Sequence, residues 1–512
     1  MKIFLPALVL VFSTHLFAEV QIPDIIGSDM VLQQRRNVPI WGTAEPGESV
    51  TVNFAGQTKT VVTGVDGKWR VELAPLHASS RPQEMTIEGK NTIRLTGILV
   101  GEVWLVAGQS NMQLRLRETD NGEAAEAAAG NPRIRLFNVS REVAFKRRSG
   151  KLGVWAPATP ISVREFSAAG YYFGVEMEKT LRVPIGLINS SYGGSQAEAW
   201  TPVEYLNASA DLKPTVERTK IWDEERSRVR VEYDAAIKKW REAAESAKAA
   251  GVRPSPSPSV PDALRDYRIA SSIYDRMVEP LIPFAVKGFI WYQGESNEGR
   301  AEQYGILLPV MIKAWRERWA ADHLPFGIVQ LPNYRSPKAE PEESAWSFIR
   351  ENQRRTVSTV KNTGLITTID IGMANDIHPK NKLDVGKRMA NWALHDIYGL
   401  KMLLAPTISR IDERNGKVYL TFENVGTGLK ISKGDRLEEF ALAGDDKKWY
   451  WADAKITRKN LIEVSSQNVP KPKAVRYAFN SNPRNPNLTN DSGLPASPFR
   501  SDDWPDPTSG KR

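Results

Sequence analysis

The sequence predicts an α/β protein in which a central parallel sheet is flanked by smaller β-rich segments. Two observations lead to this prediction. In the middle of the chain, short apolar runs typical of buried parallel strands alternate with helical stretches. Before residue 99 and after residue 400, short strands follow one another with turn residues between them. The 512 residues are 41% hydrophobic and 25% charged, which is enough for several globular domains.

The composition excludes several classes of site. The chain has no cysteine, which excludes disulfides, zinc thiolate sites, iron–sulfur clusters and a cysteine nucleophile. No pair among its five histidines has metal-ligand spacing, and no phosphate-binding or dinucleotide-binding glycine motif occurs. The net charge of +9 is small for this length, and only residues 146–148 form a basic run. We therefore expect no metal, cofactor or nucleic-acid partner.

The first 18 residues have the pattern of a secretory signal peptide. Lys2 precedes an apolar run over residues 3–12, and Ala18 stands at a plausible cleavage site. The alternative is a buried N-terminal strand. No later apolar stretch approaches the ~18 residues that a membrane span requires. We therefore expect a soluble protein that is exported to the periplasm or secreted.

Residues 20–98 are predicted to form an N-terminal β-sandwich. Turn signals such as Glu45-Pro46-Gly47 and Asp66-Gly67 separate segments rich in β-branched and aromatic residues, with no helical pattern between them. The expected strands cover residues 38–42, 49–54, 58–62, 68–73 and 92–95.

Residues 99–400 are predicted to form the domain with the parallel sheet. Its expected strands cover residues 103–107, 185–189, 288–292, 326–330 and 364–369. A helical insertion is expected over 203–265, because apolar residues recur there at steps of three or four and other faces carry charge. The helical pattern ends at Gly251, before a stiff Pro/Ser segment. We expect the apolar stripe of this insertion to pack on the α/β domain or on a second subunit.

Residues 401–512 are predicted to be β-rich and to end in a tail without regular structure. The expected strands cover residues 418–422, 439–443, 461–464 and 474–477. The residues that follow are rich in Pro, Asn and Ser.

The candidate chemistry lies just after the predicted parallel strands, where ligands bind in open α/β sheets. Three strand ends carry serine beside glycine, at Ser110, Ser195 and Ser296. A fourth carries Asp376 and His378 in one loop, which is the pairing that a serine nucleophile needs. Spacing favours Ser110 without deciding between the three serines, and each is otherwise explained by a cap or a tight turn.

Four motifs follow one another along the chain. They are Gly108-Gln109-Ser110-Asn111-Met112, Asn189-Ser190-Ser191-Tyr192-Gly193-Gly194-Ser195, Trp291-Tyr292-Gln293-Gly294-Glu295-Ser296-Asn297 and Asp376-Ile377-His378-Pro379. Together with residues 30–33 and 493–500, they resemble the sialate O-acetylesterase family, a branch of the SGNH hydrolases that removes acetyl groups from sugars. The resemblance covers nearly all of the chain after residue 18.

The resemblance implies an SGNH-type three-layer fold and a set of roles. Ser110 would be the nucleophile, His378 the general base and then acid, and Asp376 the carboxylate that orients His378. Asp370 is the alternative to Asp376. The oxyanion hole would consist of the backbone N–H groups of Ser110 and Gly194 and a side-chain amide, first Gln293 and then Asn297. Ser195 and Ser296 would be turn residues.

The expected substrate is an acetylated sugar or oligosaccharide, and neither the sugar nor the oligomeric state follows from the sequence. The family members that act on xylan and other plant glycans look similar to those that act on sialate. For a sialate carboxylate, Arg115 and Arg117 are candidate cations. One alternative function is a glycoside hydrolase that uses Glu295 and Asp376. Another is a non-catalytic protein that binds glycans through its aromatic residues.

Overall fold

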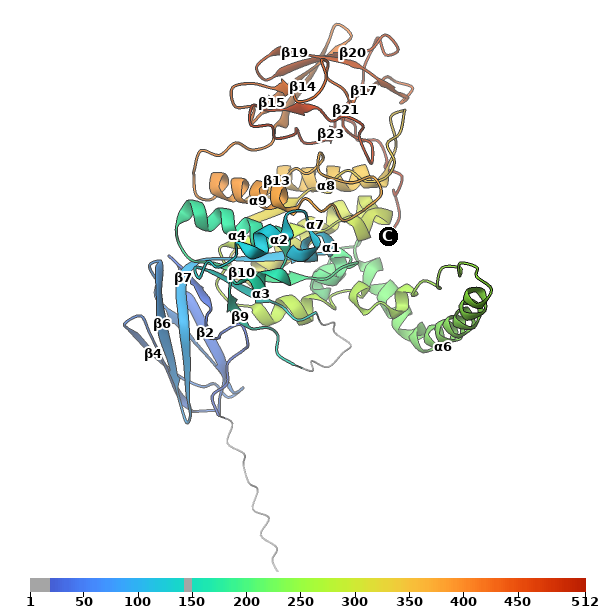
Figure 1. Cartoon of the computed structure of the whole chain (residues 1–512). Coiled ribbons are helices and arrows are strands. Elements are labelled where there is room, and N and C mark those ends of the chain that lie inside the picture. Colours follow the sequence, from blue (N-terminus) through green and yellow to red (C-terminus); the bar gives the residue numbers. More distant parts are fainter. Residues whose placement is uncertain (1–18, 142–149) are drawn as a thin grey trace, which may run out of the picture.

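The computed structural model describes residues 19–141 and 150–512, in which a layered central domain lies between two β-rich units (Figure 1). The predicted signal peptide lies outside the described residues. Within the described ranges, no helix is both long and apolar enough to cross a bilayer.

The central sheet contains the five predicted strands and two others. Its order is β13-β12-β11-β7-β10-β8-β9, and all neighbours are parallel except β8 and β9. The strands are β7 (Thr92–Gly108), β8 (Ile134–Asn138), β9 (Trp155–Pro157), β10 (Ile185–Ser191), β11 (Gly288–Tyr292), β12 (Phe326–Val329) and β13 (Thr363–Ile366). In β10, β11 and β12 every residue is buried, as expected for strands covered on both faces.

Helices cover both faces of this sheet, which confirms the three-layer α/β architecture. On one face α4 (Ala168–Leu181) and α9 (Lys382–Asp396) pack against Trp104 and Val106 of β7. On the other face α7 (Ala301–Arg318) and α8 (Ala345–Thr359) share a core with Leu105 and Ala107. Alternate residues of β7 thus enter different cores, because successive side chains of a strand point to opposite faces.

The N-terminal unit shares one strand with the central domain. β7 pairs there with β1 and β6 before it enters the central sheet, so the predicted boundary between residues 98 and 99 falls inside a continuous strand. The other strands are β1 (Val31–Gln33), β2 (Val38–Thr43), β3 (Ser49–Phe54), β4 (Gln57–Val62), β5 (Lys68–Leu73) and β6 (Ser79–Glu88). β6 was not predicted because half of its residues are exposed and most are polar.

The insertion contains α5 (Val203–Asn207) and the 37-residue α6 (Lys213–Ala249), which projects from the body as an arm (Figure 1). Only Thr215, Val216 and Ala244 of α6 are buried. The predicted apolar stripe nevertheless marks the less exposed side of α6, because its residues from Trp222 to Ala247 are half-buried or, at Ala244, buried. The first turns of α6 contact the body, and farther out Trp240 of the stripe donates to the backbone oxygen of Ser255 in the returning Pro/Ser segment at 2.8 Å.

The remaining helices are short. They are α1 (Ser110–Gln113), α2 (Gly122–Ala127), α3 (Pro160–Arg164) and the 3-10 helices η1 (Leu116–Glu118), η2 (Ala197–Trp200), η3 (Asp262–Leu264), η4 (Asp266–Arg268), η6 (Glu279–Leu281) and η7 (Glu295–Arg300), with one π-helical turn, η5 (Tyr274–Val278).

The C-terminal unit consists of two four-stranded sheets, ordered β14-β15-β20-β19 and β18-β17-β21-β23, and the pair β16-β22. The strands are β14 (Thr407–Arg414), β15 (Lys417–Glu423), β16 (Lys430–Ile431), β17 (Phe440–Ala443), β18 (Trp449–Trp451), β19 (Asp453–Arg458), β20 (Leu461–Ser465), β21 (Ala474–Tyr477), β22 (Leu488–Thr489) and β23 (Phe499–Arg500). The tail, predicted to be irregular throughout, adds the two-residue strands β22 and β23.

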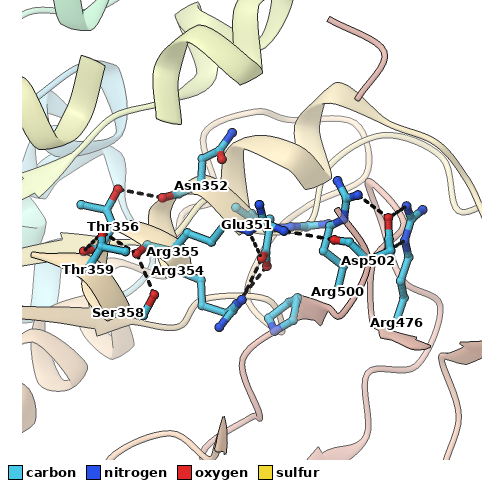
Figure 2. Close-up of polar contacts among 12 residues, drawn as sticks. Glu351, Asn352, Arg354, Arg355, Thr356, Ser358, Thr359, Arg476, Arg500 and Asp502 are labelled. Carbon is cyan, nitrogen blue, oxygen red and sulfur yellow. Dashed lines mark hydrogen bonds and ion pairs between the residues drawn. The ribbon is translucent and has the colours of Figure 1, made fainter. Parts of the chain in front are cut away.

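A buried ion cluster joins this unit to α8 (Figure 2). Asp502 accepts two hydrogen bonds of 3.0 Å from Arg476 and also pairs with Arg500. Arg355 of α8 donates to the Asp502 backbone carbonyl at 3.1 Å. We call Arg476, Arg500 and Asp502 the docking cluster.

Candidate active site at the carboxyl edge of the sheet

Ser110 lies where the order of the sheet reverses. From β7 the chain continues to β8 and β10 on one side, and then to β11 on the other. In open α/β sheets such a switch point opens a crevice outside the carboxyl ends of the strands. Ser110 begins α1 two residues after the end of the central strand β7.

Gly108 makes this arrangement possible. Its φ is +142°, and a Cβ built on it would lie 2.1 Å from the backbone oxygen of Tyr292 in β11. Any larger residue would push β7 and β11 apart. The glycine therefore lets Ser110 stand directly above the edge of the sheet.

The second motif supplies a backbone donor beside Ser110. A Cβ on Gly193 would lie 3.4 Å from Ser110 Cβ, so this loop packs directly on the serine. The Gly193 N–H donates to Gln113 Oε1 at 2.6 Å. By contrast, the N–H groups of Ser110 and Gly194 form no hydrogen bond with any residue that the structure describes. These two N–H groups are the predicted backbone donors of the oxyanion hole.

The two predicted side-chain donors have other uses. Both amide hydrogens of Gln293 are committed, at 2.7 Å to Asn297 Oδ1 and at 3.2 Å to the backbone oxygen of Ser195. Asn297 donates to Glu198 Oε2 at 2.8 Å and accepts from the N–H of Ala197 at 2.9 Å. Gln293 and Asn297 therefore tie the third motif to the loop that follows Gly194.

Glu198 lies at the centre of these contacts between the third motif and the loop after Gly194. It is almost completely buried, and it pairs with Arg218 of α6 and Arg300 of η7. Burial alone would raise the pKa of Glu198, but the charges of Arg300 and Arg218 outweigh it and hold that pKa below its ordinary value. A compensated buried charge thus anchors the root of α6 beside the site.

The fourth motif brings a carboxylate next to the histidine. Asp376 Oδ1 lies 3.7 Å from His378 Nδ1 and accepts the His378 backbone N–H at 2.8 Å. Contacts of this kind are often longer in the absence of substrate than in the working complex. The alternative carboxylate, Asp370, is held in a two-bond pair with Arg388 at 2.6 and 2.7 Å.

His378 is about one-third exposed and favours the neutral form that a general base requires. Burial lowers the pKa of His378, and the positive charges of Lys382 and Lys380 lower it further, although Asp376 opposes them. The net result is a pKa below the ordinary value of 6.5. His378 is therefore available to accept a proton at neutral pH.

Behind Ser110 lies a buried cluster that sequence reasoning missed. Asn111 donates to Glu295 Oε1 at 2.6 Å and accepts from Lys382 Nζ at 2.7 Å. Asn111 lies in the first motif and Glu295 in the third, but neither residue type indicated a contact with a lysine. Lys382, four residues after His378, has the sequence appearance of an ordinary surface lysine.

Two tyrosines beside Gly194 were also missed. The rings of Tyr192 and Tyr267 stack with centroids 5.1 Å apart, and Tyr267 Cε2 lies 3.2 Å from the position of a Gly194 Cβ. Tyr267 follows Asp266, which pairs with Arg226 of α6. The arm thus holds an aromatic surface next to the candidate oxyanion hole.

The other singled-out residues have structural contacts. Ser195 is buried, donates to the Tyr192 carbonyl at 2.7 Å and accepts from Trp200 at 2.9 Å. Ser296 donates its backbone N–H to Gln109 at 3.2 Å. Arg115 pairs with Glu118 and Glu165, and Arg117 pairs with Glu165.

A polar cavity of about 1310 Å³ lies far from this chemistry, at the amino ends of β11, β12 and β13. It is lined by Arg36, Glu102, Lys287, His323 and others, and Arg36 donates to His323 Nε2 at 2.9 Å. None of the strand-end serines lines this cavity. The catalytic candidates therefore remain those at the carboxyl edge, where Ser110 lies beside two backbone N–H groups that bond to none of the described residues and Asn111 of α1 is hydrogen-bonded to the loop of His378 at the Ile377 carbonyl.

Comparison with known proteins places these motifs in a family. A family model described as "Carbohydrate esterase, sialic acid-specific acetylesterase" matches residues 100–252 and 262–395, which is more than half of the chain. The sialate O-acetylesterase of Rattus norvegicus is 28% identical over 508 residues, which cover 90% of this chain and 89% of that protein. The human sialate O-acetylesterase is 28% identical over 524 residues, covering 93% and 91%.

Among solved structures, that of a carbohydrate acetylesterase from Xanthomonas citri is similar over its whole length. The TM-score is 0.79 and the identity 32%, and the match covers 95% of this chain and 100% of that one. The similarity therefore includes both β-rich units as well as the central domain.

Proposed function

The chain belongs to the carbohydrate esterase family of sialic acid-specific acetylesterases, and we propose that Ser110, His378 and Asp376 carry out its chemistry. The protein is a carbohydrate O-acetylesterase, and neither the glycoside hydrolase nor the non-catalytic alternative is favoured. One observation carries the proposed assignment. Ser110 stands at the switch point beside two backbone N–H groups that have no partner among the described residues.

In the first step His378 takes the proton of the Ser110 hydroxyl as its oxygen attacks the acetyl carbonyl. Negative charge develops on the carbonyl oxygen and is stabilised by the N–H groups of Ser110 and Gly194. One such donor is typically worth about 3 kcal/mol. The tetrahedral intermediate then breaks down, and the sugar oxygen leaves with the proton from His378. The acetyl group remains on Ser110.

In the second step His378 removes a proton from water, which attacks the acetyl-serine. The same two N–H groups stabilise the second oxyanion, and acetate leaves as Ser110 regains its proton. Asp376 holds the His378 ring and stabilises its positive charge in both steps. We assign Gln293 and Asn297 to the support of the Gly194 loop, because their amides already bond within it.

The substrate is proposed to be an O-acetylated sugar whose ring packs on Tyr192 and Tyr267 beside Gly194. Aromatic faces suit the apolar C–H side of a sugar ring. O-acetylated sialic acid is the first candidate, because the family description and the relatives carry that name. Arg115 and Arg117 are not assigned to its carboxylate, because Glu118 and Glu165 already pair with them.

Export is part of the proposal. Residues 1–18 have the charge and apolar pattern of a signal peptide, so the enzyme would meet its glycan substrate outside the cytoplasm. N-terminal sequencing of the protein from the fraction where it accumulates tests this. A mature chain beginning near residue 19 supports export, whereas an intact N-terminus in the cytoplasm contradicts it.

The central test combines labelling with an acetate-release panel. A fluorophosphonate probe should label Ser110, and labelling at Ser195 or Ser296 would overturn the assignment. Acetate release is then compared for O-acetylated sialic acid, acetylated xylan and acetylated xyloglucan fragments. An aryl glycoside serves as the control, and we expect no cleavage of it.

A further inference from the structure

The buried cluster behind Ser110 joins the two halves of the proposed catalytic machinery. We call Asn111, Glu295 and Lys382 the brace. Asn111 Nδ2 donates to Glu295 Oε1 at 2.6 Å and to the backbone oxygen of Ile377 at 3.0 Å. Lys382 Nζ donates to Asn111 Oδ1 at 2.7 Å and to the backbone oxygen of Pro379 at 2.8 Å.

These bonds reach both neighbours of His378. Ile377 precedes the histidine and is held by Asn111, whereas Pro379 follows it and is held by Lys382. Asn111 is itself the residue after Ser110 in α1. The brace therefore fixes the peptide groups on either side of His378 relative to the helix that carries Ser110.

We propose that Lys382 is a positioning residue, which keeps His378 in line with the Ser110 hydroxyl by holding Pro379 and Asn111 together. This inference rests on the proposed roles of Ser110 and His378. It assigns no contact between Lys382 and the substrate. Small displacements of a catalytic group lower the rate steeply, and a shift of about 1 Å can reduce it about 100-fold.

A purely structural role does not explain the brace. Lys382 and Glu295 are both almost completely buried, and Glu295 Oε2 has no hydrogen-bond partner among the described residues. Burial lowers the pKa of Lys382 to about 7 and raises the pKa of Glu295. Well-packed apolar side chains often stabilise a core as well as such a pair does. The two hydrogen bonds of Lys382 to this loop and α1 are what an apolar residue cannot replace.

Lys382 also contributes to the charge around His378. The charged groups that act on His378 are Asp376 and Lys380 in its own loop, Lys382 of α9 and Glu118 of η1. Lys382 is faced by Glu295 of η7 as well as by Lys380 and Asp376. Removing either lysine takes away a positive charge and so raises the pKa of His378. The Lys380 side chain is 37% exposed, lies 3.8 Å from Asp376 Oδ2 and, unlike that of Lys382, donates no hydrogen bond to Asn111 or Pro379.

This difference gives a matched pair of variants. Lys382→Met and Lys380→Met each remove one lysine charge near His378, and both should move the acid limb of the kcat/KM profile to higher pH. Only Lys382→Met should also lower kcat on the alkaline plateau, by about 100-fold with KM for an aryl acetate little changed. Equal plateau values for the two variants would overturn the positioning role.

Chemical rescue separates positioning from stability. The chain has no cysteine, so Lys382→Cys introduces a single thiol. Alkylating it with bromoethylamine in denaturant and refolding places a thialysine, which restores the amine at nearly the length of lysine. We expect this product to regain most of the plateau kcat, whereas alkylation with iodoacetamide should not restore it. Similar activity of the two products, each verified as folded by circular dichroism, would overturn the proposal.

Failure of the proposed function would look different. If Ser110 is not the nucleophile, Ser110→Ala retains activity and the fluorophosphonate probe labels another residue. If that assignment holds and thialysine does not restore turnover, only the role of Lys382 is wrong.

Discussion

The docking cluster and the brace are both buried charge clusters, but they differ in how well the buried carboxylate is compensated. In the docking cluster Asp502 is bonded by two arginines, Arg476 and Arg500 (Figure 2). Burial alone would raise the pKa of Asp502, but those arginines hold it below its ordinary value. In the brace, the carboxylate has one oxygen without a partner, and burial shifts the pKa of both Glu295 and Lys382 toward the neutral forms.

This difference corresponds to a difference in role. The docking cluster joins the C-terminal unit to α8, whereas the brace lies behind the proposed nucleophile. A buried carboxylate with two arginines is compensated, and its loss exposes an uncompensated charge. A less compensated pair is tolerated where it places a reacting group, and perturbed ionisable groups gather at such sites. Substitutions at the carboxyl edge should therefore lower turnover without unfolding the protein, and substitutions in the docking cluster should do the reverse.

The largest effect is expected from Ser110→Ala. It removes one partly exposed hydroxyl that has no hydrogen bond to the described residues, so the free energy of unfolding should hardly change. Loss of the nucleophile in a serine triad lowers kcat by about 10⁶-fold. Acetate release and urea unfolding check both parts. A variant that keeps its turnover would remove Ser110 from the site altogether.

The next effect is that of Asp376→Asn. Loss of the Asp376 carboxylate should reduce kcat by up to about 10⁴-fold, with little change in KM. This is the size of effect seen when the orienting carboxylate of a serine triad is removed. Asp370→Asn is the control, because Asp370 is bound to Arg388 rather than placed beside His378. If Asp370→Asn is the variant that loses turnover, the orienting carboxylate was misassigned.

Much of this arrangement was predictable because it depends on local pattern. The strands of the central sheet are continuous apolar runs, and the Gly-Ser and Asp-x-His motifs stand where those runs stop. The brace was not predictable, because it joins residues far apart in the chain. Asn111 and Lys382 are separated by 271 positions, and nothing local marks either as buried. The docking cluster was missed because two of its members, Arg500 and Asp502, lie in the tail that was expected to lack regular structure. The periodicity of α6 marks the less exposed side of the arm, but periodicity does not indicate what covers that side.

In the docking cluster we expect a loss of stability instead. Asp502→Ala leaves Arg476 and Arg500 buried without their shared carboxylate, and breaking such a pair typically costs about 3–5 kcal/mol in the free energy of unfolding. The turnover of the molecules that remain folded should be unchanged. Glu343→Ala is the control, since Glu343 is the outer, 46% exposed partner of Arg476 and an exposed pair is worth at most about 1 kcal/mol. Equal destabilisation by both variants would contradict the comparison.

The active site and the docking cluster should also respond to different ranges of pH. Activity should fall about tenfold per pH unit below the pKa of His378, which lies below 6.5, because the protonated ring cannot accept the serine proton. The pKa of Asp502 is depressed on folding, so its contribution to stability is present above the pKa of the unfolded carboxyl and is lost as pH falls through the lower folded value. An inactive but folded enzyme is therefore expected at pH values that lie below the pKa of His378 and above the pKa of folded Asp502. Simultaneous loss of activity and of circular dichroism would contradict this.

The smallest effect, and the one most dependent on substrate, concerns the arm. Arg218 of α6 pairs with the buried Glu198, and Arg226 of α6 pairs with Asp266. Because Asp266 precedes Tyr267, these pairs hold Tyr267 beside Gly194. Replacing residues 214–258 by a Gly/Ser linker leaves Arg300 on Glu198 and should spare hydrolysis of a small aryl acetate. It should lower kcat/KM for an acetylated oligosaccharide by about tenfold, the value of one aromatic contact, mainly through KM.

Replacing only residues 230–256 is the matched control for the arm, because it keeps Arg218 and Arg226 in place. If this shorter variant behaves like the native enzyme, the root of α6 accounts for substrate access and the projecting part does not. If the oligosaccharide is affected by the shorter replacement as well, the distal arm itself contacts the substrate. Equal losses for aryl acetate and oligosaccharide, with a lower Tm, would mean that the arm only braces the fold. In that case the compensated cluster around Glu198 contributes to stability alone, as the docking cluster does, although it lies near Ser110.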